Sequence, residues 1–261
     1  MAIVTLTTDL GEQDYYVAAI KGAFLKQRSD LQIVDVTHRI QHYDIVQGAF
    51  VLQNAYRHFP EGSVHVIHVN NLNSKEPSYL AFEREGHFFL GPDNGIFSLI
   101  FPQQAIEAVR LKPAGHDPFP LTSLYAEAVG RLLSGSPLKE LGEPAGDLLQ
   151  RIHLQPIVTK TGIRGTVVYI DHYENAIVNV HRDLFEKVAQ DRPAEIWFKR
   201  HDPIRRIYRH YHEVPVGEVV CFFNSSGLLE IAVNMGKAGS LLGLQVDDTV
   251  QIDFVERKKK T

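Results

Sequence analysis

The segment Leu6-Thr7-Thr8-Asp9-Leu10-Gly11 decides how the first half of the chain folds. The largely apolar and β-branched residues at positions 3–6 predict a buried strand, and the pattern over 15–26 predicts a helix. The polar residues of the segment therefore stand at the carboxyl end of the first strand, where open α/β sheets form their ligand crevices. Gly11 at the end of the segment would let a ligand approach the backbone closely.

The other patterns of the first half repeat this alternation. They predict strands over 32–36 and 64–69 with a helix over 44–59 between them, and a hairpin of strands 79–82 and 87–90 around Gly86. Helices between strands imply crossover connections and a mostly parallel sheet. With a last helix over 123–133, we expect an N-terminal α/β domain over residues 1–155.

The pattern of predicted elements changes after a stretch rich in glycine and proline at 135–146. Short strand patterns separated by turn residues then follow, with few helical patterns among them. They predict a small β-barrel or sandwich as a C-terminal domain over residues 163–256. The patterns lie at 165–170, 176–180, 195–198, 219–223 and 250–254.

The composition excludes several classes of protein. The 261 residues include 27 Lys and Arg against 31 Asp and Glu, so no basic field favours nucleic acid. The single cysteine, Cys221, excludes an intramolecular disulfide framework. The chain has no run of about 20 apolar residues and no signal-peptide pattern, so we expect a cytoplasmic protein without a membrane segment. The 13 histidines lack metal-ligand spacing, so no metal site is expected.

Asp9 is the first candidate binding residue. A carboxylate at a strand end can accept both hydrogen bonds of a ribose diol. Aspartate is also favoured as a helix N-cap, so Asp9 can equally cap the helix that follows. The residues around Asp9 leave both interpretations open.

Three further polar turns contain candidate residues. Residues 91–95, Gly-Pro-Asp-Asn-Gly, are a dense turn signal. The turn at 171–175 combines an acid, an aromatic ring and an amide, which suits recognition of a purine by stacking and hydrogen bonds, although a polar hairpin uses the same residue types. A third turn covers 223–227 and precedes two more polar residues. The candidates from the last two turns and their surroundings are Asp171, Tyr173, Asn175, Ser225, Glu230 and Asn234.

No serine-hydrolase elbow, phosphate-binding loop or dinucleotide-binding motif occurs. The polar motifs instead resemble, in order and over the whole chain, the S-adenosyl-L-methionine (SAM) hydroxide adenosyltransferases. These are adenosine-forming SAM hydrolases related to the fluorinases and chlorinases. The resembling segments are 6–11 (LTTDLG), 14–22 (DYYVAAIKG), 33–40 (IVDVTHRI), 48–50 (GAF), 91–95 (GPDNG), 169–171 (YID) with Asn175, and 224–232 (NSSGLLEIA) before Asn234.

The resemblance implies a fold, an assembly and a reaction. It implies an N-terminal α/β domain, a C-terminal β-barrel, and a homotrimer in which SAM binds between the N-terminal domain of one subunit and the C-terminal domain of its neighbour. Water or hydroxide attacks the C5′ carbon of the ribose, and methionine departs. The reaction requires no metal or redox cofactor, so the expected partner is a small adenosyl ligand.

The resemblance also implies roles for individual residues. Asp9 holds the ribose hydroxyls, and Tyr43 falls where the halogenase branch has an aromatic residue against the ligand. Tyr173 and Asn175 flank the adenine. The other residues that we expect in the ligand site are Asn70, Asp171, Ser225, Glu230 and Asn234.

The chain departs from the family where the water is handled. Hydrolase members have an Asp, an Arg and a His at these positions, and an ungapped pairing puts Asn70, Pro77 and Pro120 there. An amide is no base, and proline has no polar side-chain group. Ser226 replaces an Arg that often follows the Asn-Ser pair in the halogenase branch.

Two hypotheses follow from these departures. The protein is an enzyme that still cleaves SAM, with His68 or His116 taking over the activation of water. Alternatively, it binds SAM or adenosine without turnover, as a sensor or a sink.

Overall fold

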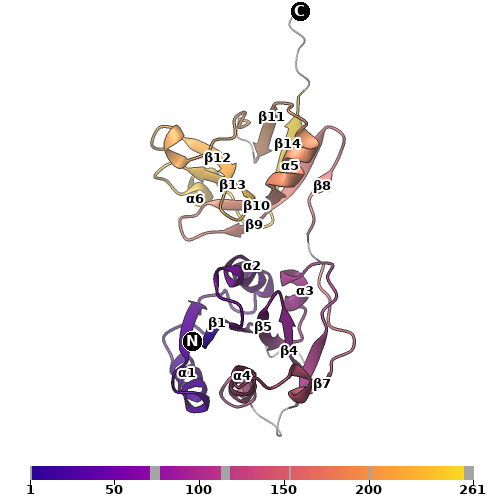
Figure 1. Ribbon diagram of the computed structural model, residues 1–261. Helices are drawn as coiled ribbons and strands as arrows, with labels where there is room; N and C mark the ends of the chain where they lie inside the picture. The colour runs from indigo at the N-terminus through magenta and orange to yellow at the C-terminus, as the bar shows by residue number, and fades with distance from the viewer. Residues whose placement is uncertain (1, 71–76, 113–117, 153, 200–201, 256–261) are drawn as a thin grey trace, which may run out of the picture. The chain divides into compact units, whose positions relative to one another are not determined.

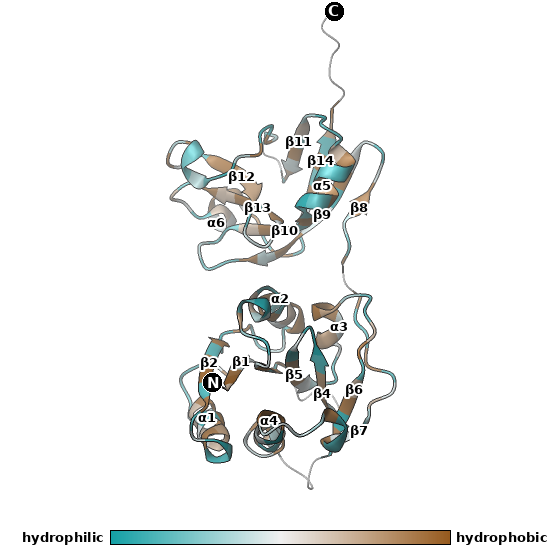
Figure 2. Cartoon of the chain, in the orientation of Figure 1, coloured by the Kyte–Doolittle hydropathy of each residue, from teal (hydrophilic) through white to brown (hydrophobic). Residues whose placement is uncertain are grey.

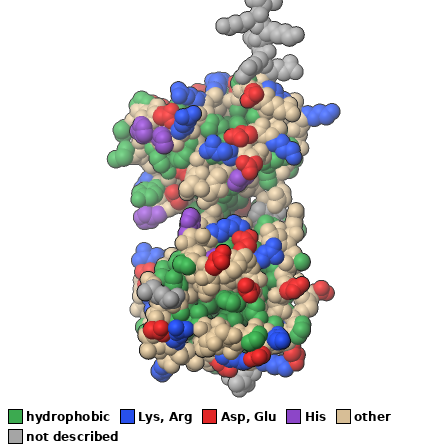
Figure 3. Space-filling view, in the orientation of Figure 1, with side chains coloured by type: hydrophobic (Ala, Val, Ile, Leu, Met, Phe, Trp, Pro, Cys, Tyr) green, Lys and Arg blue, Asp and Glu red, His purple; other side chains and the backbone are tan. Residues whose placement is uncertain are grey.

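The computed structural model of the protein describes residues 2–70, 77–112, 118–152, 154–199 and 202–255. The chain forms two compact units, Met1–His153 and Leu154–Thr261. Among the described residues, no helix is both long and apolar enough to cross a bilayer. In the face drawn in Figure 3, acidic and basic side chains are interspersed over each unit, in keeping with the nearly balanced charge.

The first unit is built on a mixed seven-stranded sheet in the order β2-β1-β3-β5-β4-β6-β7 (Figure 1). The pairings within β2-β1-β3-β5 are parallel, and the others within the described residues are antiparallel. The prediction of a mostly parallel sheet is therefore confirmed only for the first half. The strands are β1 (Ile3–Thr8), β2 (Gln32–Thr37), β3 (Val64–His68), β4 (Tyr79–Arg84), β5 (His87–Pro92), β6 (Ala108–Leu111) and β7 (Gly142–Pro144).

A tight hairpin explains why the sheet changes direction. Glu85 and Gly86 join β4 to β5, and their φ angles of 52° and 76° are those of a two-residue turn with both central residues left-handed. Such a turn can only pair strands antiparallel, since a parallel pair needs a long crossover.

Helices cover both faces of this sheet. Helices α1 and α4 pack on one face, where the core includes Leu6, Phe24 and Tyr125. Helices α2 and α3 pack on the other face, where Ile67 and Leu52 are buried. In Figure 2, the brown of hydrophobic residues is visible on β1, whose Val4 and Leu6 are buried. The helices are α1 (Tyr16–Gln27), α2 (Ile45–Ala55), α3 (Ile96–Ile100) and α4 (Leu124–Leu133), with short 3-10 turns η1 (Tyr56–His58), η2 (Pro120–Thr122) and η3 (Leu138–Glu140).

The second unit is a curled antiparallel sheet in the order β11-β14-β9-β10-β13-β12. One segment touches both of its edges: Ile204 pairs with Ile196 of β11, and the N–H of Tyr208 donates to the carbonyl of Cys221 in β12 at 2.8 Å. This curvature is the half-barrel form of the predicted β-barrel. The strands are β8 (Ile157–Val158), β9 (Gly162–Ile170), β10 (Ala176–His181), β11 (Ala194–Phe198), β12 (Val219–Phe223), β13 (Leu228–Val233) and β14 (Thr249–Phe254).

Two helices and one 3-10 turn complete the second unit: α5 (Arg182–Ala189), α6 (Ala238–Leu242) and η4 (Tyr211–Glu213). Helix α5 was not expected from the sequence pattern. It is short, and three of its apolar residues, Leu184, Phe185 and Val188, pack against the core of the sheet. Its helical form depends on this packing, because helices below about 12 residues are marginal on their own.

Candidate functional site

Asp9 lies just beyond β1, where loops from three neighbouring strands meet. Its Oδ2 atom accepts hydrogen bonds from the backbone N–H of Tyr43, at 3.0 Å, and of Asn70, at 3.2 Å. Tyr43 follows β2 and Asn70 follows β3. Within the described residues, Oδ1 has no hydrogen bond. Both described hydrogen bonds thus hold the carboxylate by the same oxygen.

Asp9 does not cap a helix. Helix α1 begins at Tyr16, and its N-cap is Tyr15, with no side-chain capping bond. The alternative in which Asp9 serves only as an N-cap is therefore wrong. Its hydrogen bonds run across the sheet edge instead of along the chain.

Both residues that hold Asp9 have unusual backbone conformations. Tyr43 has φ of 68° and Asn70 has φ of 53°. Left-handed backbone costs of the order of 1–3 kcal/mol for residues other than glycine, and it occurs often at functional sites. Here it accompanies two amides that donate to one carboxylate. The side chain of Tyr43 is 65% exposed, so it is available to a ligand.

The Gly91–Gly95 segment does more than turn the chain. Asn94 Nδ2 donates to the carbonyls of Val69, at 2.8 Å, and Asn70, at 3.2 Å. Asp93 accepts from the N–H of Leu149 at 3.0 Å. The segment therefore fixes the chain at the end of β3, and with it the amide that binds Asp9.

His68 is the last residue of β3 and is buried beside Tyr125, with ring centroids 5.7 Å apart and nearly perpendicular. Among the described residues, its Nδ1 and the Tyr125 hydroxyl are buried without hydrogen-bond partners. Burial lowers the pKa of His68 to about 4, although the Asp9 carboxylate acts in the opposite direction. His68 is consequently neutral at pH 7.

The other positions of the altered water site differ in their surroundings. Pro77 is exposed, whereas Pro120 is buried as the first residue of η2. Asn70 uses its backbone at the site, since its N–H binds Asp9 and its carbonyl binds Asn94. His116 lies outside the described residues.

The second unit has its own polar network. Asp171 accepts from the N–H and the side-chain Nδ2 of Asn175, at 2.7 and 3.0 Å. The same Nδ2 lies 3.5 Å from the Tyr211 hydroxyl, which donates to Glu230 at 2.5 Å. Burial raises the pKa of Glu230, and burial together with Glu230 raises that of Tyr211. Three predicted residues are thus joined through a fourth, Tyr211.

Tyr211 was not among the predicted site residues. It lies in a stretch rich in tyrosine and histidine, within η4. The pairing of β10 with β13 brings Asn175 close to Glu230, and Tyr211 contacts both of them from η4. The remaining candidates are less connected. Tyr173 is 73% exposed and Ser225 is exposed, whereas Asn234 Nδ2 donates to the Val214 carbonyl at 2.7 Å, a bond within the fold.

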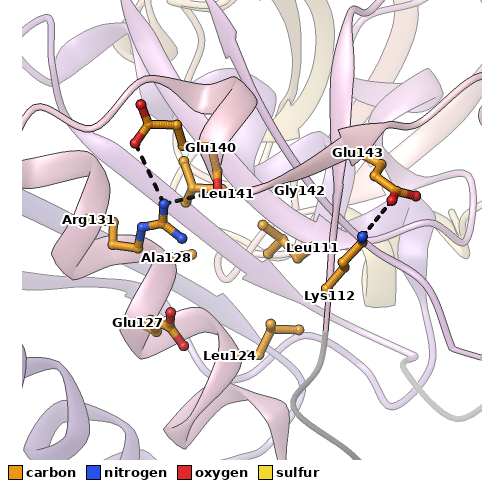
Figure 4. Close-up of a pocket in the computed structure, with 10 residues that line it drawn as sticks. All are labelled: Leu111, Lys112, Leu124, Glu127, Ala128, Arg131, Glu140, Leu141, Gly142 and Glu143. Carbon is orange, nitrogen blue, oxygen red and sulfur yellow. Dashed lines mark hydrogen bonds and ion pairs between the residues drawn. The ribbon is translucent and has the colours of Figure 1, made fainter.

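The first unit also has a hollow of about 330 Å³ between α4 and the β6–β7 edge (Figure 4). Its charged side chains largely neutralise one another, since Lys112 pairs with Glu143 at 2.5 Å and Arg131 lies 3.8 Å from Glu140. Asp9, Tyr43 and Asn70 do not line it. The hollow is therefore separate from the polar cluster around Asp9.

Comparisons with known proteins agree with the motifs. The profile of the SAM hydroxide adenosyltransferase N-terminal domain matches residues 4–142, and that of the C-terminal domain matches residues 165–251. The chain is 28% identical to an (R)-S-adenosyl-L-methionine hydrolase of Methanocaldococcus jannaschii over 97% of this chain and 96% of that protein. It is 30% identical to a protein of the same name from Thermus thermophilus, over 94% and 97%.

The fold has a counterpart among solved structures. A conserved protein from Thermotoga maritima superposes with a TM-score of 0.86 at 22% identity, covering 97% of this chain and all of that one. The collinear motifs and the match of both domain profiles lead to one conclusion. The chain belongs to the SAM hydroxide adenosyltransferase family.

Proposed function

We propose that this protein binds SAM with Asp9 on the ribose diol and cleaves it to adenosine and methionine. The observation that carries the proposal is the Asp9 carboxylate, whose Oδ2 is held by two backbone amides while Oδ1 has no hydrogen bond within the described residues. A carboxylate oxygen with both lone pairs available suits two adjacent hydroxyls. The names of the two hydrolase relatives support the same substrate.

The proposed reaction is a displacement at carbon. The oxygen of water bonds to C5′ as the bond from C5′ to sulfur breaks, and the electron pair of that bond stays on sulfur. Methionine leaves as a neutral thioether, and the water gives up one proton. Because the leaving group is already activated as a sulfonium, holding water in line with it supplies much of the rate.

The altered residues support a slow enzyme. Asn70, Pro77 and Pro120 offer neither a base nor a cation for the water. Loss of general base catalysis costs about 10²- to 10⁴-fold in rate. His68 is the described residue best suited to accept the proton, because it is neutral, has an unpartnered nitrogen and lies close enough to Asp9 to be affected by its charge. His116 is a second candidate.

The adenine end is proposed to lie in the second unit. The network of Asp171, Asn175, Tyr211 and Glu230 presents an amide and a hydroxyl whose positions are set by the carboxylates of Asp171 and Glu230. Exposed Tyr173, in the same turn, is suited to stack on a base. Asn175→Ala is expected to weaken adenosine binding.

The second candidate function is binding without turnover, as a sensor or a sink. The loss of all three water-handling residues favours it. A single-turnover experiment, with protein in excess over SAM and chromatographic detection of adenosine, separates the two. Adenosine formed by the wild type but not by Asp9→Asn supports the enzyme; bound SAM that stays intact supports the binding protein; and no binding of SAM overturns both.

A further inference from the structure

A line of four polar side chains leads from the surface of the first unit to the residue before Asp9. Lys21 Nζ lies 2.5 Å from Asp35 Oδ2, and Asp35 Oδ1 lies 3.1 Å from His38 Nε2. His38 Nδ1 is 2.8 Å from Thr8 Oγ1. His38 is 2% exposed and Thr8 is fully buried, so the inner end of the line is shielded from solvent.

The Thr8 hydroxyl and the His38 ring each have two polar contacts. Thr8 Oγ1 accepts from the N–H of Leu10 at 3.3 Å and shares a hydrogen bond with His38 Nδ1. The other ring nitrogen, Nε2, faces Asp35. Asp35 in turn is balanced by Lys21, and both partners lower its pKa against the effect of burial.

The backbone on either side of Asp9 is bound to residues 38 and 40. The carbonyl of His38 accepts from the N–H of Gly11 at 2.8 Å, and the carbonyl of Thr8 accepts from the N–H of Ile40 at 3.4 Å. Together with the contact from the imidazole to Thr8, these bonds fasten both ends of the turn 8–11. Asp9 stands in the middle of that turn. The turn that carries Asp9 is therefore linked to the buried imidazole of His38 through Thr8.

The order of carboxylate, imidazole and hydroxyl is also that of a hydrolytic triad. A nucleophile must reach its substrate, and Thr8 is fully buried with its hydroxyl already bound to His38 Nδ1 and to the N–H of Leu10. The array is consequently suited to hold a neighbour and not to attack a substrate.

We propose that His38 is a positioning residue for ligand binding, which acts through Thr8 to direct the Asp9 carboxylate at the ribose hydroxyls. The inference rests on the proposed function of Asp9. Supporting residues of this kind are commonly worth about 10- to 100-fold in the affinity of the site that they orient.

The same strand supplies a matched control. Thr5 Oγ1 lies 2.8 Å from His65 Nδ1, so β1 has a second buried pair of threonine and histidine with the same geometry. Thr5 and Thr8 point to opposite faces of the sheet, because side chains alternate along a strand. His65 Nε2 is hydrogen-bonded to His87 Nδ1 at 3.1 Å, and His65 has no hydrogen bond to the turn 8–11. Truncating His65 disturbs a core histidine without disturbing Asp9.

The test measures adenosine affinity by titration calorimetry on the full-length protein, with thermal melting to confirm folding. We expect His38→Ala to weaken binding about tenfold or more, and His65→Ala to change it less than about twofold. His38→Asn, whose side-chain amide can stand at the Nδ1 position as donor or acceptor, should restore most of the affinity. His38→Gln, whose amide lies nearer the Nε2 position, should not. If an alanine variant fails to fold, the difference in affinity between His38→Asn and His38→Gln tests the inference in its place.

A double-mutant cycle with Asp9→Asn shows whether His38 acts through Asp9. If it does, His38→Ala costs much less in the Asp9→Asn background than in the wild type. Equal losses for His38→Ala and His65→Ala, or full additivity with Asp9→Asn, overturn the inference while leaving the proposed function intact. Unchanged affinity in Asp9→Asn overturns the proposed function of Asp9, and the inference with it.

Discussion

At the scale of single residues, Asp9 concentrates the binding function that we propose. Its Oδ2 is immobilised by amides of Tyr43 and Asn70, so little ordering of the side chain remains when a ligand binds. Asp9→Ala should weaken adenosine or SAM binding by about 1.5–3 kcal/mol, the usual contribution of hydrogen bonds to a charged group. Titration calorimetry checks this, and unchanged affinity would mean that Asp9 only organises the loops around it.

His68 is the residue on which the proposed chemistry depends. His68→Ala should lower kcat for SAM cleavage by about 10²-fold with little change in KM, because the residue is proposed to act on water and not on the adenosyl group. Tyr125→Phe is the matched control, since it keeps the ring that packs against His68 and removes only the hydroxyl. If kcat is unchanged in His68→Ala, the base is elsewhere, and His116→Ala is the next variant to assay.

At the scale of elements, the central strands carry buried histidines that link stability to pH. His65 on β3 contacts Thr5 on β1 and His87 on β5. Burial, together with the nearby His87, lowers the pKa of His65 to about 3. The unfolded chain, with a histidine pKa near 6.5, therefore takes up the proton more readily than the folded chain.

This linkage predicts acid sensitivity with a definite sign. The contribution of a neutral buried His65 is complete above about pH 6.5 and is lost as the pH falls toward 3, at up to about 1.4 kcal/mol per pH unit. His68 adds to the same slope, since its pKa is also lowered. Urea unfolding between pH 5 and 8 measures the slope, and His65→Asn should make it shallower. An equal slope in that variant would show that His65 is not the group responsible.

At the scale of the whole molecule, each unit supplies one part of the proposed ligand site: the ribose end from the first and the adenine end from the second. The family resemblance implies that subunits combine these parts in a homotrimer. We therefore expect multi-angle light scattering to give about three times the 29.5 kDa chain mass. A monomer at micromolar concentration would remove the trimer from the proposal.

Local patterns were enough to predict most elements, because the spacing of apolar residues that marks a strand or a helix can be seen within a short run of the sequence. The predicted helix over 44–59 corresponds to α2 and η1, and the predicted strand over 250–254 to β14. The motifs likewise identified the family and the position of Asp9. The antiparallel half of the first sheet was harder to predict. Its strands β6 and β7 are only four and three residues long, too short to show a clear alternation of apolar and polar residues.

The contacts that make the site were decided only by the tertiary structure. The donors to Asp9 are backbone amides of residues 34 and 61 positions away. Nearly every residue type has a backbone N–H, so the sequence does not show which residues donate. The pairing of Thr8 with His38 and the reach of Tyr211 to Glu230 likewise span 30 and 19 positions. Such contacts depend on which strands become neighbours and on how their loops turn. Sheet order and left-handed loop residues are set by the packing of the whole unit, not by the nearby sequence.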